Sequence, residues 1–208
     1  MTRSDEHFGA ILPPIMKPAS QPYLMSFGTG GAHLNESIDL ASFRCAGASW
    51  DEITARTNVF AFRKEASAKR LVKELTHRLR RLDDDDLALF CAGDRVEQQA
   101  LIWLAICRTY RFIGEWASLV LWDHAQSYQY QIGYADFDRF WREKAEQVPD
   151  LAMLTASTRA KLRAVLFRLM RETGVTDEYG RLNGGLPPAR IADRLADSER
   201  LYFPGRRR

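Results

Sequence analysis

The segment of residues 94–124 constrains the fold of this chain more than any other part of the sequence. It begins with DRVE, in which a helix-capping aspartate precedes a glutamate by three residues, and continues through the apolar run ALIWLAIC. A membrane span needs about 20 apolar residues. This segment reaches that length only by including Arg108, Arg111 and Glu115. We therefore expect a long helix over 95–124 that is buried in the protein core and does not cross a membrane.

Helical patterns account for most of the remaining chain. No segment shows the sustained alternation of apolar and polar residues that marks a half-buried strand. The expected helices cover residues 31–46, 50–58, 65–82, 84–92, 95–124, 136–147, 156–173 and 188–196. The predicted fold class is therefore all-α.

We expect a helical bundle followed by a C-terminal unit that resembles a helix-turn-helix. Residues 23–134 form the bundle and residues 135–204 the C-terminal unit. A mobile proline-rich arm over 1–22 precedes them, and a basic tail over 205–208 follows. The segment VTDEYGRLNGGL, residues 175–186, contains two turn patterns, so a short β-hairpin wing is an open alternative there.

The cysteines and the N-terminus indicate the cell compartment. Cys45, Cys91 and Cys107 lie far apart in the sequence and match neither a disulfide framework nor a zinc ribbon. Free thiols are typical of a reducing compartment. The N-terminus has no basic start followed by an apolar run, so we expect no signal peptide and a cytoplasmic protein.

The glycine-rich segment SFGTGG, residues 26–31, has two interpretations. It is either a loop that grips a phosphate at a helix N-terminus or a turn that lets the backbone enter a helix. A phosphate loop normally follows a buried strand and supplies a lysine at a fixed place. Here MKPASQPYLM precedes the glycines and AHLNES follows them, with no strand before and no lysine after. The sequence favours the structural interpretation.

No catalytic or metal site stands out. Four consecutive aspartates over 83–86 invite a metal interpretation, but acidic side chains at a helix start also cap free N–H groups, and we favour the cap. None of the histidines stands in a motif with a cysteine or serine. They are His7, His33, His77 and His124. We expect no enzymatic activity, no metal and no cofactor.

The net charge of +3 is unevenly distributed along the chain. Residues 56–81 carry nine basic and two acidic side chains, a balance of +7. Residues 82–155 carry six and thirteen, a balance of −7, and residues 156–208 carry twelve and six, a balance of +6. Two basic blocks separated by an acidic one predict an oriented surface and not a uniformly charged one.

The first basic block contains an amphipathic helix over 66–82. Its apolar side chains fall in an arc of about 100° and most of its cations in a separate arc of about 120°, with Glu74 and Arg78 at the edge. At about 1.5 Å per residue the row of cations is about 18 Å long, which matches several phosphates of a nucleic acid. The alternative is a solvated basic face. The candidate DNA-binding residues here are Lys69, Arg70, Lys73, Arg80 and Arg81.

The second basic block contains a helix over 157–174. The small residues Ala160 and Ala164 lie between its cations, where they would let a backbone approach closely. This helix is either the recognition helix of a winged helix-turn-helix or the last helix of a bundle with snorkelling arginines, and the sequence leaves both open. The candidate DNA-binding residues on it are Lys161, Arg168 and Arg171.

Several segments, in their order and spacing, resemble the BrxA family of BREX phage-defence systems. They are SFGTGG, SAKRLVKELTHRL, EQQALIWLAICRTYRFIGEWA, DFDRFWREKA and LTASTRAKLRAVLFRLMRETG, within residues 23–204. The resemblance implies an all-helical, soluble, non-enzymatic protein that binds double-stranded DNA. Its further partners would be other BREX components: methyltransferase, phosphatase-like and ATPase subunits. Members have also been labelled inner-membrane proteins, against which the charges within 94–124 argue.

Three functions follow from these observations. The first is a DNA-binding accessory protein of a phage-defence complex, in which the two basic helices contact the duplex. The second is a scaffold whose basic faces dock acidic surfaces of partner proteins. The third is an RNA-binding helical module. The family brings no agreed catalytic motif, so the candidate binding residues rest on the charge pattern.

Overall fold

The computed structural model describes residues 23–27, 30–56 and 65–205. The expected N-terminal arm, the last three residues of the tail and the end of the helix expected over 50–58 lie outside these ranges. The described residues form helices and no strand, which confirms the all-α class. The elements are α1 (Leu34–Cys45), α2 (Trp50–Ala55), α3 (Glu65–Leu79), α4 (Asp84–Ala92), α5 (Arg95–Thr109), α6 (Arg111–Glu115), the π-helix η1 (Trp116–Leu121), α7 (Trp122–Gln126), α8 (Tyr134–Gln147), α9 (Pro149–Ala152), α10 (Ala156–Glu172), α11 (Ala189–Ala192) and α12 (Asp197–Arg200).

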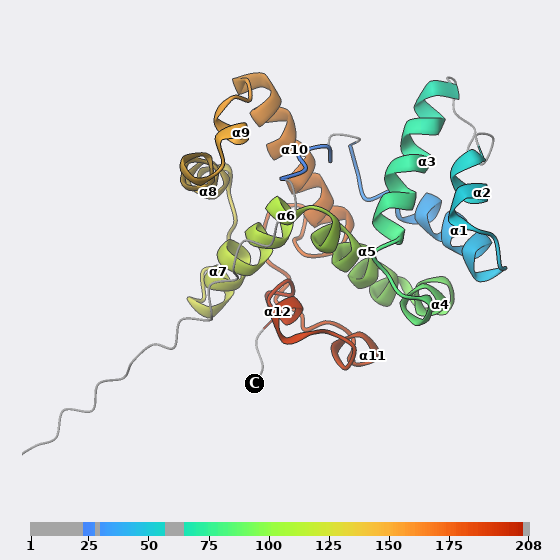
Figure 1. Cartoon of the computed structure of the whole chain (residues 1–208). Helices are drawn as coiled ribbons and strands as arrows, with labels where there is room; N and C mark the ends of the chain where they lie inside the picture. Colours follow the sequence, from blue (N-terminus) through green and yellow to red (C-terminus); the bar gives the residue numbers. More distant parts are fainter. Residues whose placement is uncertain (1–22, 28–29, 57–64, 206–208) are drawn as a thin grey trace, which may run out of the picture.

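The segment from α5 to α7 is a central spine on which the other helices pack. Figure 1 shows α1 to α4 toward the α5 end of this spine, α8 to α10 toward its α6–α7 end, and α11 and α12 beneath it. Residues 101–107 of α5 are buried all round the helix, as expected for the most apolar segment of the chain. A single buried cluster joins Leu75 of α3, Trp103 of α5 and Leu169 of α10. The division into a bundle and a C-terminal unit stays a prediction.

The spine is not the single helix expected over 95–124. It breaks at Tyr110, whose backbone is extended (φ −111°, ψ 100°). Tyr110 is fully buried, and its hydroxyl donates a hydrogen bond to Glu74 of α3. Its ring packs edge-on against the Phe27 ring, with 5.5 Å between the two ring centres. These tertiary contacts outweigh the local helical preference, which is a weak determinant when side chains are buried.

Side-chain caps begin several helices, and those of α4 and α5 lie where the sequence predicts them. Ser49 and Asp94 form capping boxes with Glu52 and Glu97, at the starts of α2 and α5. Asp83 accepts a hydrogen bond from the Asp86 N–H at 2.7 Å, so the run of aspartates caps α4.

The C-terminal segment holds α4 and α5 together through arginines. The indole N–H of Trp103 donates to the Tyr202 carbonyl at 2.8 Å. Arg108 contacts Glu199 at 2.7 Å and Asp86 at 3.2 Å, and Arg194 contacts the same Asp86 at 2.8 Å. The buried Asp86 is thus paired with two guanidinium groups, so the aspartate run also anchors the end of the chain.

The segment over 175–186, where a short hairpin is an open alternative, makes isolated bridges. Thr176 faces Leu182 and Gln131 faces Arg181 in antiparallel bridges, and the Leu182 N–H donates to the Tyr130 carbonyl at 2.8 Å. The turn after α10 is therefore tied to the chain just before α8. The helix-turn-helix unit and its wing stay predictions. Within the part of the chain that the structure describes, no helix is long and apolar enough to cross a membrane.

Loss of stability at acidic pH is expected from Glu199. Burial raises the pKa of this carboxyl, but hydrogen bonds from Arg108 and the Ala196 N–H outweigh burial and hold the pKa below its usual value. Such a group stabilises the fold at pH values above about 4.5, and the stabilisation is lost as the pH falls through the folded-state pKa. We expect urea unfolding to show a smaller loss of stability on acidification in Glu199→Gln than in the wild type.

Asp197 supplies the matched control for this measurement. Its carboxylate is fully exposed two residues earlier, so Asp197→Asn should retain the wild-type dependence of stability on pH. Parallel pH curves for Glu199→Gln and the wild type would contradict the role assigned to the contact between Glu199 and Arg108.

Candidate nucleic-acid interface

The five candidate cations of α3 and its C-terminal turn are all exposed in the structure. The opposite face of the helix is buried, with Leu71, Val72, Leu75 and Leu79 at 5% exposure or less. Arg80 makes an exposed ion pair with Asp51 of α2 at 3.2 Å, an interaction worth about 0–1 kcal/mol in such settings. The exposed cations of this helix, here called the α3 basic face, are Lys69, Arg70, Lys73, Arg80 and Arg81.

Arg78 does not belong to the α3 basic face, although the sequence places it at the edge. Its side chain is fully buried. It donates to the Gly31 carbonyl at 2.9 Å and to the Glu74 carboxylate at 3.0 Å, and its guanidinium lies 5.6 Å from the centre of the Tyr110 ring. Burial lowers the pKa of Arg78, and the charges of Glu74 and Glu172 oppose that shift. The available sequence signal was its position between the basic and apolar arcs, with Glu74 one turn before it.

The three candidate cations of α10 are also exposed. The apolar stripe expected on this helix is buried, from Leu162 to Met170. Ala160 and Ala164 are exposed, and their side chains are small. The α10 basic face consists of Lys161, Arg168 and Arg171.

Two other arginines of α10 have a structural role. Arg159 and Arg163 both contact Asp138 of α8, at 2.8 and 3.0 Å. The Arg163 guanidinium also lies 4.3 Å from the centre of the Tyr134 ring. These contacts hold α10 against α8 and leave the α10 basic face on another side of the helix.

The glycine segment links the two basic helices. The Gly31 carbonyl accepts from Arg78 of α3, and the Gly30 carbonyl accepts from Arg168 of α10 at 3.0 Å. The Ala32 N–H donates to Glu172 of α10 at 2.6 Å. Gly30 has φ +109°, which favours glycine, and a Cβ on Gly31 would lie 2.8 Å from a Glu172 oxygen. These contacts support the structural interpretation of this loop.

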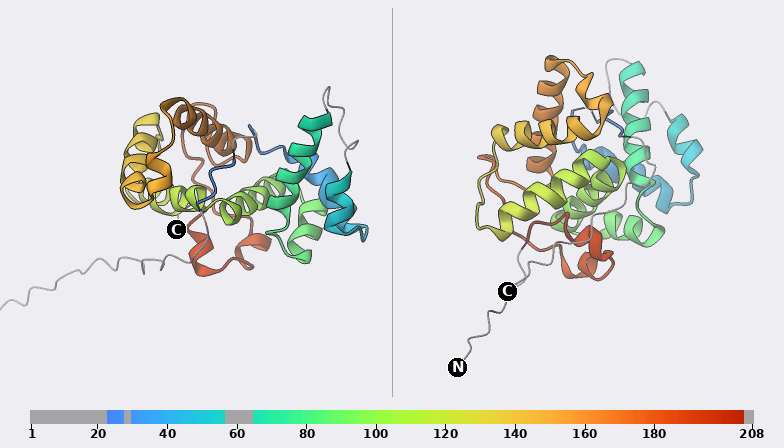
Figure 2. Two further views of the ribbon diagram at one scale, coloured as in Figure 1. Left: turned by 45° about the horizontal axis from the view of Figure 1, so that its top comes forward. Right: turned by 60° about the vertical axis from the view of Figure 1, so that its left-hand side comes forward.

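The α10 basic face borders this segment through Arg168, whereas the α3 basic face approaches it at one edge only. On α3, Arg70 lies one turn before Glu74, which accepts from the Tyr110 hydroxyl. Arg81 lies one turn after Arg78, which donates to the Gly31 carbonyl. On α10, Lys161 lies about two turns before Arg168, on the same side of the helix. Figures 1 and 2 show α3 and α10 on either side of the chain that leads into α1, in all three views.

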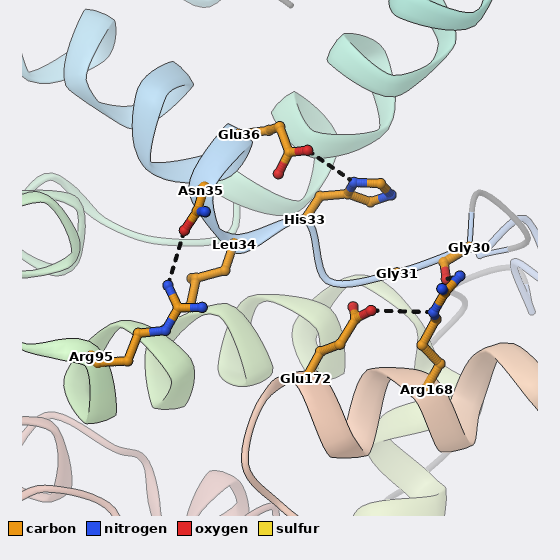
Figure 3. Close-up of a pocket in the computed structure, with 9 residues that line it drawn as sticks. All are labelled: Gly30, Gly31, His33, Leu34, Asn35, Glu36, Arg95, Arg168 and Glu172. Atoms are coloured by element: carbon orange, nitrogen blue, oxygen red, sulfur yellow. Dashed lines mark hydrogen bonds and ion pairs between the residues drawn. The ribbon is translucent and has the colours of Figure 1, made fainter.

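A cavity of about 410 Å³ lies beside the glycine segment (Figure 3). Arg168 points into it and pairs with Glu172 at 3.2 Å, and Arg95 donates to Asn35 at 3.0 Å. Glu36 lies 3.5 Å from the ring of His33. Two arginines are thus balanced by two carboxylates, and no lysine lines the cavity, unlike a phosphate loop.

A metal site needs several ligand side chains close together. Within the described ranges, no three His, Cys, Asp or Glu side chains are placed to hold an ion. His33, His77 and His124 lie on separate elements, before α1 and on α3 and α7.

The BrxA family model matches residues 21–199 of the chain. The crystal structure of an uncharacterized protein from Magnetospirillum magneticum is similar, with a TM-score of 0.72, 19% identity, and coverage of 88% of this chain and 96% of that one. At this identity the likeness shows a shared fold. The search of curated proteins finds no match.

Replacing Arg78 is expected to destabilise the fold strongly. Arg78→Met removes a buried guanidinium and leaves Glu74 and the Gly31 carbonyl with one partner fewer. Breaking a buried ion pair in this way costs about 3–5 kcal/mol. Arg70→Met, at an exposed position of the same helix, should change the free energy of urea unfolding by about 0.5 kcal/mol or less. Equal losses for the two variants would contradict the structural role of Arg78.

Proposed function

Because the chain belongs to the BrxA family, we propose that it is a non-enzymatic accessory component of a BREX phage-defence system that binds double-stranded DNA. Family membership supports the defence role and suggests other BREX components as partners. BrxA is a defence accessory family and not a known enzyme family. We further infer that the protein binds DNA through its two basic faces and lies in the cytoplasm.

The observation that carries the proposal is the pair of exposed basic faces on α3 and α10, two helices that both contact the glycine segment. Several of their cations are available for a ligand, since Lys73, Lys161 and Arg171 make no ion pair with any described residue. A duplex carries one negative charge per about 1.7 Å of its axis, so a rigid array of cations gains affinity by releasing counterions. In this proposal, the α3 basic face contacts the phosphate backbone.

The α10 basic face fits a closer approach to the duplex. Ala160 and Ala164 leave a low surface between Lys161 and Arg168, and the turn that follows α10 is fixed to the chain before α8. In a winged helix-turn-helix arrangement, α10 would be the recognition helix and the turn over 175–186 would take the place of the wing. Contacts from both faces would then lie on the same duplex.

Titration of the protein with a fluorescent random-sequence duplex at several salt concentrations tests this function. We expect log affinity to fall with log salt with a slope of about 4 or more, because several phosphates are neutralised. An equal length of structured RNA should compete more weakly than unlabelled duplex. Absence of binding at low salt would overturn the proposal, and stronger competition by RNA would show that the nucleic acid is RNA.

Charge reversal on the two faces provides a second prediction. Lys73→Glu combined with Lys161→Glu should weaken binding to every duplex sequence and lower the salt slope by about 2, since two phosphate contacts are lost. Arg142→Glu, an exposed position of α8 outside both basic faces, is the matched control. Equal affinities for the double variant and the control would show that the two faces are not the binding surface.

A further inference from the structure

Two cysteines that are far apart in the sequence meet in the structure. Cys45 is the last residue of α1 and Cys91 lies near the end of α4. Their Sγ atoms are 3.2 Å apart, within the range of a thiol hydrogen bond. The third cysteine, Cys107, is buried in α5. The pair forms where α1 and α4 pack against each other.

The two thiols of this pair differ in their access to solvent. Cys45 is exposed and Cys91 is partly buried. Burial raises the pKa of Cys91 to about 11, with a further contribution from the neighbouring Cys45. The thiolate is the reactive form of cysteine, so an oxidant in solution meets Cys45 first and Cys91 second.

We propose that Cys45 and Cys91 form a reversible disulfide that joins α1 to α4 when the protein meets a thiol oxidant. A disulfide bond is about 2.05 Å long, so the two sulfurs need to approach by only about 1 Å from their present positions. Cys45 ends its helix and its side chain reaches solvent, so a small movement there disturbs no buried packing.

The reaction with a low-molecular-weight disulfide such as oxidised glutathione balances in two exchange steps. The Cys45 thiolate attacks one glutathione sulfur, the bond between the two glutathione sulfurs breaks, and one glutathione thiolate leaves. Cys91 then loses its proton to solvent and attacks the Cys45 sulfur, and the second glutathione leaves. Two protein thiols are oxidised and one glutathione disulfide is reduced to two thiols.

The bond would close a covalent loop around α2 and α3. The chain between Cys45 and Cys91 contains both helices, including the α3 basic face and Arg78. A disulfide across a loop of this length restricts the unfolded chain and raises stability. Oxidation would therefore stabilise the region that carries α3, and this consequence is independent of whether the protein binds DNA.

The test uses the full chain treated with oxidised glutathione, followed by blocking of the remaining thiols and mass spectrometry. We expect the wild type to lose two reactive thiols, to keep no glutathione, to yield a linked peptide pair with Cys45 and Cys91, and to gain about 5 °C or more in Tm. A reductant should reverse all of these changes.

Single variants identify the order of the steps. In Cys91→Ser, no second thiol displaces glutathione, so a stable adduct on Cys45 is expected. In Cys45→Ser, we expect no disulfide and no gain in Tm. A lasting glutathione adduct on the wild type, a dimer linked through Cys45, or thiols that stay unreacted would each overturn the proposal.

Discussion

The arrangement of α3 and α10 depends on hydrogen bonds between two arginines and the backbone of the glycine segment. Arg78 reaches the Gly31 carbonyl from α3, and Arg168 reaches the Gly30 carbonyl from α10. Glu172 accepts from the Ala32 N–H. Arg78 is the buried one of the two, and a hydrogen bond from a buried cation to a carbonyl is among the stronger ones in a protein. Loss of the Gly31 carbonyl as acceptor would leave the Arg78 charge desolvated and one partner short. The glycines are needed because the backbone passes close to these side chains.

The basic residues of the chain divide into two groups with different surroundings. Buried or half-buried arginines join elements: Arg78 meets the glycine segment, Arg108 meets Glu199, and Arg163 meets Asp138. The planar guanidinium suits such sites because it makes several directed hydrogen bonds at once. Lys73 and Lys161, by contrast, are exposed on the two basic faces. The proposed contact with DNA uses mainly the second group, while Arg168 of the α10 basic face also donates to the Gly30 carbonyl.

Periodicity and helix caps predicted the all-α class and most helix positions, because those signals are local. The break at Tyr110 was not predictable, since its causes are contacts with Glu74 and Phe27 from distant parts of the chain. Burial of Arg78 was missed for the same reason: a helical wheel shows its angle but not the segment that covers it. The pair formed by Cys45 and Cys91 depends on the packing of α1 against α4, which sequence spacing does not reveal.

We propose that the basic faces of α3 and α10 contact the same duplex, and lysine labelling tests this most directly. Acetylation rates are measured by mass spectrometry with and without saturating duplex. The rate at Lys73 reports whether the duplex covers α3, and the rate at Lys161 reports whether it covers α10. Lys144, which is largely buried and 2.7 Å from Glu115, serves as the internal reference. We expect the duplex to lower the acetylation rates of Lys73 and Lys161 together, while the rate at Lys144 stays constant. Protection confined to one of the two helices would contradict it.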